Sequence, residues 1–348
     1  MADVARAAGV AQSTVSRILN RAPEAILVTE ATRERVLAAA QRLDYRPNPL
    51  ARALRGAPTM LMGAIVRDVT DPFFAVAIDA LSSTAAEHGY SLVLGHARSR
   101  ADEALALAAV LEARQCDAIL LLGDFREEPM LIDDLRQSQV PVVAMWHGSH
   151  IKGFHSVTVD NHAGIRDALD HLSGLGHRRI AFVGGESLGD IREREEAYRE
   201  YFGETDIVVP DSFVQRASNT FLGPGPALER LLRSPEPPTA LMAATDVLGA
   251  GLIHAAVGLG LRVPDDLSIV GFDDIPFAAA TVPALTTVHM PVAEMSAAAV
   301  ELALSPDRDP TDRETRILTP TLVTRSSTAP PPLQHHLASR PAAGLPNG

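Results

Sequence analysis

Short apolar runs of strand length alternate with helical patterns along most of this sequence, from Met60 onward. Such pairs of a run and a helical pattern include Leu61–Val66 with 74–87, Ala118–Leu122 with 130–137, Ile207–Val209 with 227–232, and Ala240–Ala244 with 248–257. Strands joined through helices form parallel sheets with right-handed crossovers. The alternation therefore predicts an α/β body of two doubly wound parallel-sheet subdomains, each of roughly a hundred residues.

The segment from Asp3 to Asn20 has the pattern of two short helices separated by Gly9. Apolar residues line one face of each helix, so the pattern predicts a helix-turn-helix with Val4, Val15 and Ile18 inside. The second helix exposes short polar side chains that suit base edges and phosphates in a major groove, namely Gln12, Ser13, Thr14, Ser16 and Arg17. An ordinary helical hairpin with a solvated polar face is the alternative that spacing alone leaves open.

A third helix is expected to begin at a capping Thr29 and to run to about Asp44, with Val36, Ala40 and Leu43 facing inward. Beyond it, Asn48-Pro49 marks the start of a very short helix that ends near Leu54, because Asn caps helices and Pro suits their first turn. So short a helix is marginal in water, and we expect it to order only against a partner chain and DNA.

The charge of the chain is segregated along its length. The first 58 residues carry nine Arg against five acidic residues, whereas the remainder carries 22 basic and 38 acidic residues. A small basic head on a large acidic body is the electrostatic pattern of a DNA-binding module attached to a part that must not adhere to phosphates. The net charge of −12 therefore does not exclude nucleic acid as a partner.

Two stretches, "DVARAAGV" with "STVSRILN" and "ATRERVLAAAQRLDYRPNPLARALR", resemble the DNA-binding head and hinge of the LacI/GalR family of bacterial transcription regulators. The likeness extends over nearly the whole chain. It implies a periplasmic-binding-protein-like body, a homodimer, and binding to a pseudo-palindromic operator in double-stranded DNA. The DNA contacts implied are Gln12, Ser13, Thr14, Ser16, Arg17, Asn20, Tyr45, Asn48, Arg52 and Leu54, with Leu54 wedged into the minor groove. Packing of Leu54 on the body is the alternative.

The chain departs from the family pattern in three places. It starts almost at the first helix, Ala11 stands where relatives have a capping Ser, and the loop 21–27 is about three residues longer. Loss of such a cap costs about 1 kcal/mol. None of these changes touches the residues expected to face the groove.

The domain boundaries follow from these patterns and the resemblance. We expect a helix-turn-helix domain at 1–47, a hinge helix and linker at 48–58, and an effector-binding and dimerisation domain at 59–327. Its N-subdomain takes 59–158 and 288–315, and its C-subdomain takes 159–287 and 316–327, since in the family the chain crosses between subdomains three times. The Pro- and Ala-rich tail, 328–348, is predicted to be disordered, and it has no leucine heptad that would support a tetramer.

Ligands of open parallel sheets bind beyond the carboxyl ends of the strands, and the residues at these positions are rich in polar groups. They are Asp68, Asp71–Phe74, His96, Asp124, Trp146, Thr245-Asp246 and Asp273-Asp274. Acidic residues there also cap the following helices, so Asp68, Asp71 and Asp124 remain open between a cap and a ligand contact. Trp146 has a similar alternative as a buried residue between the two halves.

The resemblance adds specific roles to this set. "ATDVLGAG" resembles the family's NDxxAxG segment, and "VGFDD" with "PALTTV" matches the segment whose Asp holds ligand hydroxyls, here Asp273. Arg194 matches the Arg that anchors the effector, with Arg192 as the alternative. The effector-binding residues expected are Phe73, Asp124, Trp146, Arg194, Phe221, Asp246 and Asp273, and their guanidinium, carboxylates and rings suit a sugar or sugar derivative.

The sequence offers little for other classes of function. It contains no phosphate loop, no GxSxG elbow and no HExxH motif, so no catalytic residue, cofactor or metal is expected. The histidines 147, 150, 155 and 162 lie in a predicted loop between the halves, and their spacing suits no common zinc site.

No apolar run could span a membrane, and the single Cys116 favours the reducing cytoplasm. We therefore expect a cytoplasmic, sugar-responsive repressor; the alternatives are a sugar-binding protein and an α/β sugar enzyme without a regulatory role.

Overall fold

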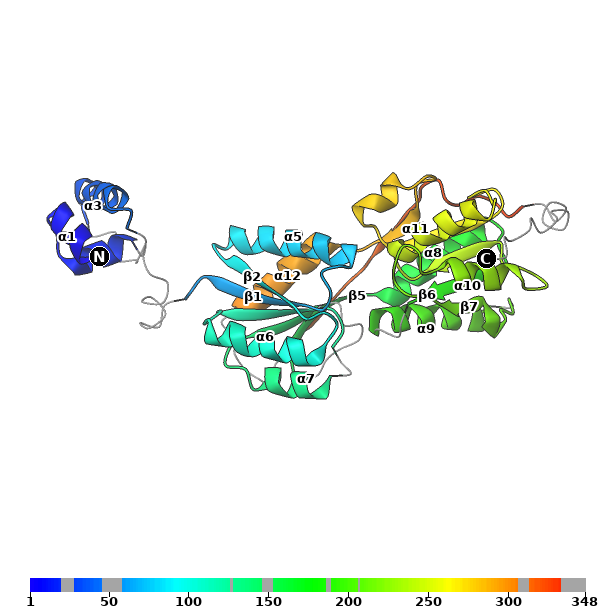
Figure 1. Ribbon diagram of the computed structural model, residues 1–348, viewed down its shortest axis with the longest axis horizontal. Coiled ribbons are helices and arrows are strands. Elements are labelled where there is room, and N and C mark those ends of the chain that lie inside the picture. The colour runs from blue at the N-terminus through cyan, green and yellow to red at the C-terminus, as the bar shows by residue number, and fades with distance from the viewer. Residues whose placement is uncertain are drawn as a thin grey trace, which may run out of the picture. The chain divides into compact units, whose positions relative to one another are not determined.

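The computed structural model describes residues 1–19, 28–45, 58–125, 128–145, 153–185, 189–205, 207–305 and 313–332. The chain divides into two compact units, Met1–Leu61 and Met62–Gly348. Figure 1 shows both units. Each unit has a hydrophobic core of its own. In the part of the chain that the structure describes, no helix is long and apolar enough to cross a membrane.

The first unit contains three helices, α1 (Ala2–Ala8), α2 (Gln12–Leu19) and α3 (Glu30–Arg42). Gly9 ends α1 in the left-handed conformation, with φ of 66°, which an L side chain adopts only at a cost. Val4, Val15 and Val36 come one from each helix, and all three are fully buried. The helix-turn-helix prediction is therefore confirmed down to its turn residue.

Two expectations about α3 are wrong. The Thr29 hydroxyl pairs with the hydroxyl of Thr32 at 2.9 Å and accepts no backbone N–H. Leu43 is exposed, because α3 ends at Arg42 and Asp44 adopts a positive φ of 44°. Tyr45 takes the inward position instead and packs against the core of this unit.

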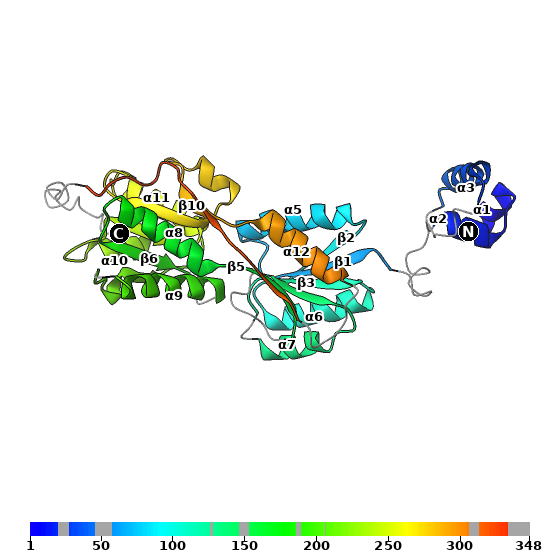
Figure 2. The ribbon, with the colours of Figure 1, turned by 180° about the vertical axis from the view of Figure 1, so that it is seen from behind.

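The first sheet of the second unit has six strands in the described residues, in the order β11-β5-β4-β3-β1-β2. The strands are β1 (Leu61–Val66), β2 (Ser91–His96), β3 (Ala118–Leu122), β4 (Val142–Met145), β5 (His155–Val159) and β11 (Thr315–Leu318). Helices α5 (Pro72–Glu87) and α12 (Val292–Leu304) cover one face, and α6 (Ala101–Ala113) and α7 (Pro129–Arg136) cover the other (Figures 1 and 2). The order reverses between β1 and β3, so a crevice is expected where these two strands end.

The second sheet also has six strands in the described residues, in the order β12-β10-β9-β8-β6-β7. The strands are β6 (Ile180–Gly184), β7 (Val214–Arg216), β8 (Ala240–Ala243), β9 (Ser268–Asp273), β10 (Thr286–His289) and β12 (Thr321–Val323). It packs with α8 (Asn161–Gly174), α9 (Gly189–Gly203), α10 (Gly225–Leu232) and α11 (Asp246–Gly258), and two short 3-10 helices, η2 (Asp211–Phe213) and η3 (Pro276–Ala280), lie in its connections. The strand order of this sheet reverses between β6 and β8. The prediction of two doubly wound sheets is confirmed.

The chain passes from one sheet to the other after β5, after β10 and after β11. The last passage corrects the predicted boundary, because residues 316–318 belong to β11, which pairs in parallel with β5 of the first sheet. Residues 288 and 289 likewise stay in the second sheet, where they pair with β9. We call the part around the first sheet the N-lobe and the part around the second sheet the C-lobe.

Three further expectations are corrected by the fold. The run Ile207–Val209 is not a strand: Pro210 follows it, Val208 is exposed, and the edge strand is β7 at Val214–Arg216. The stretch predicted as a loop between the halves contains β5 at its end. The start of the tail is ordered, because Thr328 bonds to His171 at 3.0 Å and the carbonyl of Ala329 accepts from His177 at 2.8 Å. Residues 333–348 lie outside the described residues.

Candidate functional site

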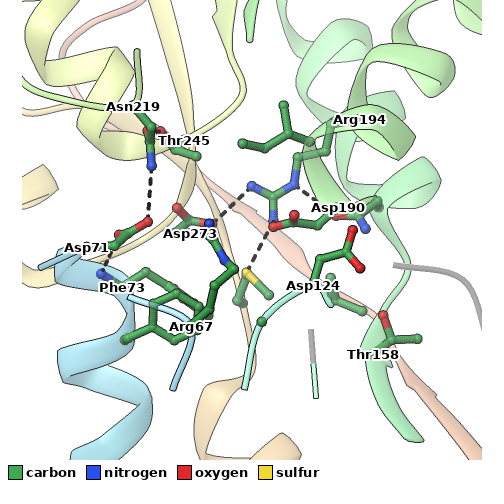
Figure 3. A pocket seen from close by; sticks show the side chains of 16 residues that line it. Arg67, Asp71, Phe73, Asp124, Thr158, Asp190, Arg194, Asn219, Thr245 and Asp273 are labelled. Carbon is green, nitrogen blue, oxygen red and sulfur yellow. Dashed lines mark hydrogen bonds and ion pairs between the residues drawn. The ribbon is translucent and has the colours of Figure 1, made fainter. Parts of the chain in front are cut away.

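A small cavity lies where the carboxyl ends of both sheets meet, and we call it the inner chamber (Figure 3). Four of the seven expected effector-binding residues line it, namely Phe73, Asp124, Arg194 and Asp273. The first two come from the N-lobe and the last two from the C-lobe. The chamber holds about 30 Å³ of free space, which is room for about two water molecules. Its own side chains therefore nearly fill it.

Arg194 of α9 is the central side chain of the inner chamber. It is 2% exposed, and its guanidinium donates to the Asn161 side chain at 2.9 Å, the Ala244 carbonyl at 2.6 Å and the Asp273 carboxylate at 3.1 Å. The sulfur of Met290 lies 3.6 Å from a third nitrogen, and the guanidinium stacks 3.7 Å from the centre of the Phe272 ring. A buried charge is tolerated only when it is paired and hydrogen-bonded, and Arg194 meets that condition.

Asp273 is the last residue of β9, and its backbone φ of 115° lies in the region that L residues rarely adopt. This turn of the backbone comes at the strand end, where the carboxylate reaches Arg194. Burial raises the pKa of Asp273 well above its usual range, while the Arg194 guanidinium opposes that rise. Asp274 is held differently, by Arg325 at 2.5 Å and His289 at 3.0 Å.

Two hydrogen bonds join the lobes beside this pair. Asp71 accepts from the amide of Phe73 at 3.0 Å, which caps α5, and its other oxygen accepts from Asn219 of the C-lobe at 3.1 Å. Asp124 accepts from the amide of Gly189 at 2.5 Å, at the start of α9. A carboxylate is favoured at a helix N-terminus, so Asp124 stabilises α9 across the cleft. Burial also raises the pKa of Asp71.

Asp71 thus caps a helix, which is one of the two roles that the sequence left open, and it also lines the inner chamber, whereas Asp68 has a local role. The Asp68 carboxylate accepts from the amide of Thr70 at 2.9 Å and from its hydroxyl at 2.7 Å, which closes a turn. It lines a second cavity instead of the inner chamber.

Asp246, which the sequence predicts to contact the effector, lies behind the inner chamber. Its side chain is fully buried and lines neither cavity. One oxygen accepts from the Thr287 hydroxyl at 2.5 Å and the other from the Ile275 amide at 2.9 Å. Burial raises the pKa of Asp246. Asp246 therefore fastens α11 to β10 and to the segment after β9, behind the chamber.

Phe221, another expected effector-binding residue, lines the second cavity and not the inner chamber. We call this second cavity the outer chamber; it is open to solvent, holds about 800 Å³, and shares Arg67, Asp71, Ile191 and Asn219 with the inner chamber. Trp146 lies outside the described residues. Arg192, the alternative anchor, is half-buried and does not line either chamber.

Sequence reasoning missed several residues that line the inner chamber, among them Arg67, Thr158, Asn161, Asp190 and Asn219. Asp190 had a usable signal, since it precedes Arg194 by one helical turn and its carboxylate lies 3.8 Å from the guanidinium. Asn161 is the first residue of α8, two positions beyond the end of β5, the strand that the sequence pattern did not show. Asn219 lies in a long connection where no periodicity points to it.

The histidines of the predicted interlobe loop are dispersed. His155 is a buried residue of β5 whose ring accepts from the Glu314 amide at 3.1 Å, and His162 of α8 lies 3.1 Å from Glu200. His147 and His150 lie outside the described residues. Among the described residues, no group of His, Cys, Asp and Glu could hold a metal ion.

The polar face of α2 is arranged as expected. Gln12, Ser13 and Arg17 are exposed, Thr14 and Ser16 are half-buried, and Val15 and Ile18 form the buried side. The helix therefore offers donors and acceptors that a base edge or a phosphate could meet. The other expected DNA contacts, Asn20, Asn48, Arg52 and Leu54, lie outside the described residues.

Comparisons with family models match both parts of the chain. Residues 1–48 match the model for bacterial regulatory proteins of the lacI family, and residues 169–328 match a periplasmic binding protein-like domain. The two matches fall on the helical unit and mainly on the C-lobe.

Curated proteins and solved structures agree with these models. Catabolite control protein A of Priestia megaterium is 34% identical over 86% of this chain and 90% of its own length. The transcriptional regulator GalR of Escherichia coli is 32% identical over 97% of this chain and 98% of its own. A lac repressor dimer bound to operator and the anti-inducer ONPF aligns with a TM-score of 0.82 at 26% identity, covering 94% of this chain and 98% of that one. A complex of the regulator CelR with cellobiose aligns with a TM-score of 0.67 at 28% identity, covering 93% of this chain and 98% of that one.

We expect Arg194→Ala to destabilise the body by about 3 kcal/mol, because it leaves the Asp273 carboxylate buried without its partner. The folded-state pKa of Asp273 is raised, so its ionisation lowers stability as the pH rises through that pKa. Without the guanidinium that pKa rises further. Urea unfolding should therefore show a larger loss for Arg194→Ala at pH 8 than at pH 5.

Two controls belong to this experiment. Arg199→Ala, on the same helix but with a half-exposed side chain paired to Glu195, should cost less than about 1 kcal/mol at either pH. Adding Asp273→Asn to Arg194→Ala should remove the pH dependence of the loss. An equal loss at pH 5 and pH 8 would contradict the account of the buried pair.

Proposed function

Since the chain belongs to the lacI family of bacterial regulatory proteins, we propose that it is a repressor whose operator affinity is set by a small, sugar-like effector. It binds a pseudo-palindromic operator in double-stranded DNA as a homodimer, with one helical head on each half-site. The observation that carries the proposal is one chain with two features: a helix-turn-helix whose polar face is exposed, and a cavity between two lobes built on Arg194 and Asp273.

The chemistry of the inner chamber supports a sugar as the effector. A guanidinium and a carboxylate on rigid elements can grip neighbouring hydroxyls, since one donates and the other accepts. Phe73 offers an apolar face in the same chamber. The CelR structure contains cellobiose, so a sugar ligand has a precedent in a similar protein.

The alternative functions have weaker support. A plain sugar-binding protein does not need the helix-turn-helix unit, and the curated relatives named above are regulators. A sugar enzyme has weaker support for the same reason, because the curated relatives named above are regulators. Because an operator lies on the chromosome, we place the protein in the bacterial cytoplasm.

On the DNA we assign different roles to Arg17 and Gln12. Arg17 at the end of α2 binds phosphate and sets the register, whereas Gln12 and Ser13 at its start read base edges. Tyr45 packs on the core of the helical head, so we assign it an indirect role in DNA binding through that core. The segment from Asn48 to Leu54 connects effector to operator by ordering or melting as the body changes, and Leu54 opens a base step.

We expect Arg17→Ala to weaken binding to every duplex and to reduce the slope of log affinity against log salt by about one. Gln12→Ala should lose about 1–3 kcal/mol of binding free energy on the preferred operator. It should lose little on an operator variant in which the base pair that Gln12 reads has been changed. Fluorescence anisotropy with a set of single-base operator variants measures both effects. Arg114→Ala, an exposed arginine at the end of α6, is the control that should change neither. A uniform loss for Gln12→Ala across all variants would refute its assignment.

Asp273→Asn should greatly weaken the response of operator binding to effector, because a neutral amide replaces the charged acceptor for the ligand hydroxyl. Loss of a charged hydrogen bond predicts roughly 30-fold weaker effector binding. A panel of monosaccharides and disaccharides identifies the sugars that shift operator binding by the unchanged protein, and the variant is titrated with those. Asp274→Asn is the matched control, since that neighbouring carboxylate lines neither chamber. An Asp273→Asn variant that still responds at the same sugar concentration would contradict the proposed site.

A further inference from the structure

The outer chamber is much larger than the inner one, and the proposed grip on a sugar does not use it. Its apolar lining includes Pro72, Ile191, Phe221, Val247, Ala250, Phe277 and Ala280. A space of about 800 Å³ lies within the range of pockets that bury a small molecule. Most of this lining comes from three segments of the C-lobe, which are 218–221, α11 and η3 with Thr281.

The aromatic wall of the outer chamber is positioned by close packing. The Phe221 ring lies 5.1 Å from the ring of His254 on α11. A side chain at Gly251 of the same helix would overlap the carbonyl oxygen of Phe221, so glycine allows this segment to lie directly on α11. Phe277 is half-buried on η3 and packs against the core of the body. Two aromatic rings from separate segments thus stand at one chamber.

The two chambers are divided by a hydrogen bond between the lobes. Asn219 and Asp71 line both chambers, and the Asn219 amide donates to the Asp71 carboxylate at 3.1 Å. Thr245 orients Asn219 by donating to its side-chain oxygen at 2.7 Å (Figure 3). About 30 Å³ cannot hold a sugar ring, so the lobes must separate when one enters. A ligand hydroxyl can then replace one partner of this bond, and the chambers become continuous.

The charges of the inner chamber restrict what can enter. Asp71, Asp124, Asp190 and Asp273 line it against two cations, Arg67 and Arg194. An anionic ligand would meet an excess of negative charge in a site with little water, whereas hydroxyl groups donate to carboxylates without that cost. Phosphorylated and acidic sugars are therefore disfavoured.

We propose that the effector is an uncharged glycoside of two rings, with a sugar ring on Arg194 and Asp273 in the inner chamber and a second ring against Phe221 and Phe277 in the outer chamber. This inference rests on the proposed function and specifies the ligand class of the same site. A second sugar presents its C–H face to the aromatic rings, and an aryl group stacks on them.

The test compares ligands that share one sugar ring and differ in the second. Isothermal titration calorimetry on the full chain uses methyl glycosides of glucose and galactose, the corresponding phenyl glycosides, cellobiose, lactose and glucose 6-phosphate. The two-ring glycosides of one sugar should bind about tenfold more tightly than its methyl glycoside, since each aromatic contact adds a fraction of that factor. Glucose 6-phosphate should bind more weakly than the methyl glycosides.

Variants in the outer chamber separate its contribution from folding. Phe221→Ala and Phe277→Ala should each lower the affinity for the two-ring glycoside part of the way to that of the methyl glycoside, and the double variant should bind both ligands equally. Affinity for the methyl glycoside should stay unchanged in all three variants. Leu222→Ala is the control, because Leu222 is 73% exposed beside Phe221 and lines neither chamber. The phenyl and disaccharide arms show which kind of second ring the chamber takes, and tighter binding of either supports the proposal.

Three results would overturn the proposal: equal affinities for methyl and two-ring glycosides, Phe variants that weaken both ligands alike, or no binding of any two-ring glycoside. None of these overturns the proposed function. A one-ring effector that acts through Asp273 would still satisfy the operator assay, so the two ideas fail on different measurements.

Discussion

The buried pair of Arg194 and Asp273 is the interaction on which the site depends. Moving a guanidinium and a carboxylate out of water costs several kcal/mol for each ion, and their attraction offsets this only when the remaining donors are satisfied. Here the other donors of Arg194 reach Asn161 at the start of α8 and the carbonyl of Ala244 after β8. One side chain thereby ties together the ends of two strands and the beginnings of two helices. A ligand at the proposed site would meet groups that are already oriented, which reduces the cost of binding.

Two hydrogen bonds between the lobes at this site are suitable for a switch. Asp71 with Asn219, and Asp124 with the amide of Gly189, hold the chamber in its nearly filled form. Both carboxylates can exchange a protein donor for a ligand hydroxyl at little cost in free energy. The lobes are connected by three passages of the chain, so they can move against each other. A ligand shifts such an equilibrium only through its different affinity for the two forms.

The sequence predicted most of the framework, because the strands and helices of both sheets have clear apolar periods. Arg194 and Asp273 could also be predicted, since they belong to motifs with local sequence signatures. Asp246 carries a similar signature, but its partners Thr287 and Ile275 come from distant segments that close over it only in the fold. Asn219 was missed for the same reason: its function depends on Asp71, 148 residues away. The boundary at 316 was misplaced because pairing of β11 with β5 leaves no local mark in the sequence.

In the proposed function, one protein couples a ligand between its lobes to operator DNA at its head. Coupling of two binding events is reciprocal, so each must change the affinity of the other by the same factor. The direct measurement is the affinity for the effector by calorimetry, for the free protein and for the protein saturated with operator duplex. The ratio of these two effector affinities should equal the ratio of the operator affinities measured with and without saturating effector. Identical effector affinities with and without operator would contradict it.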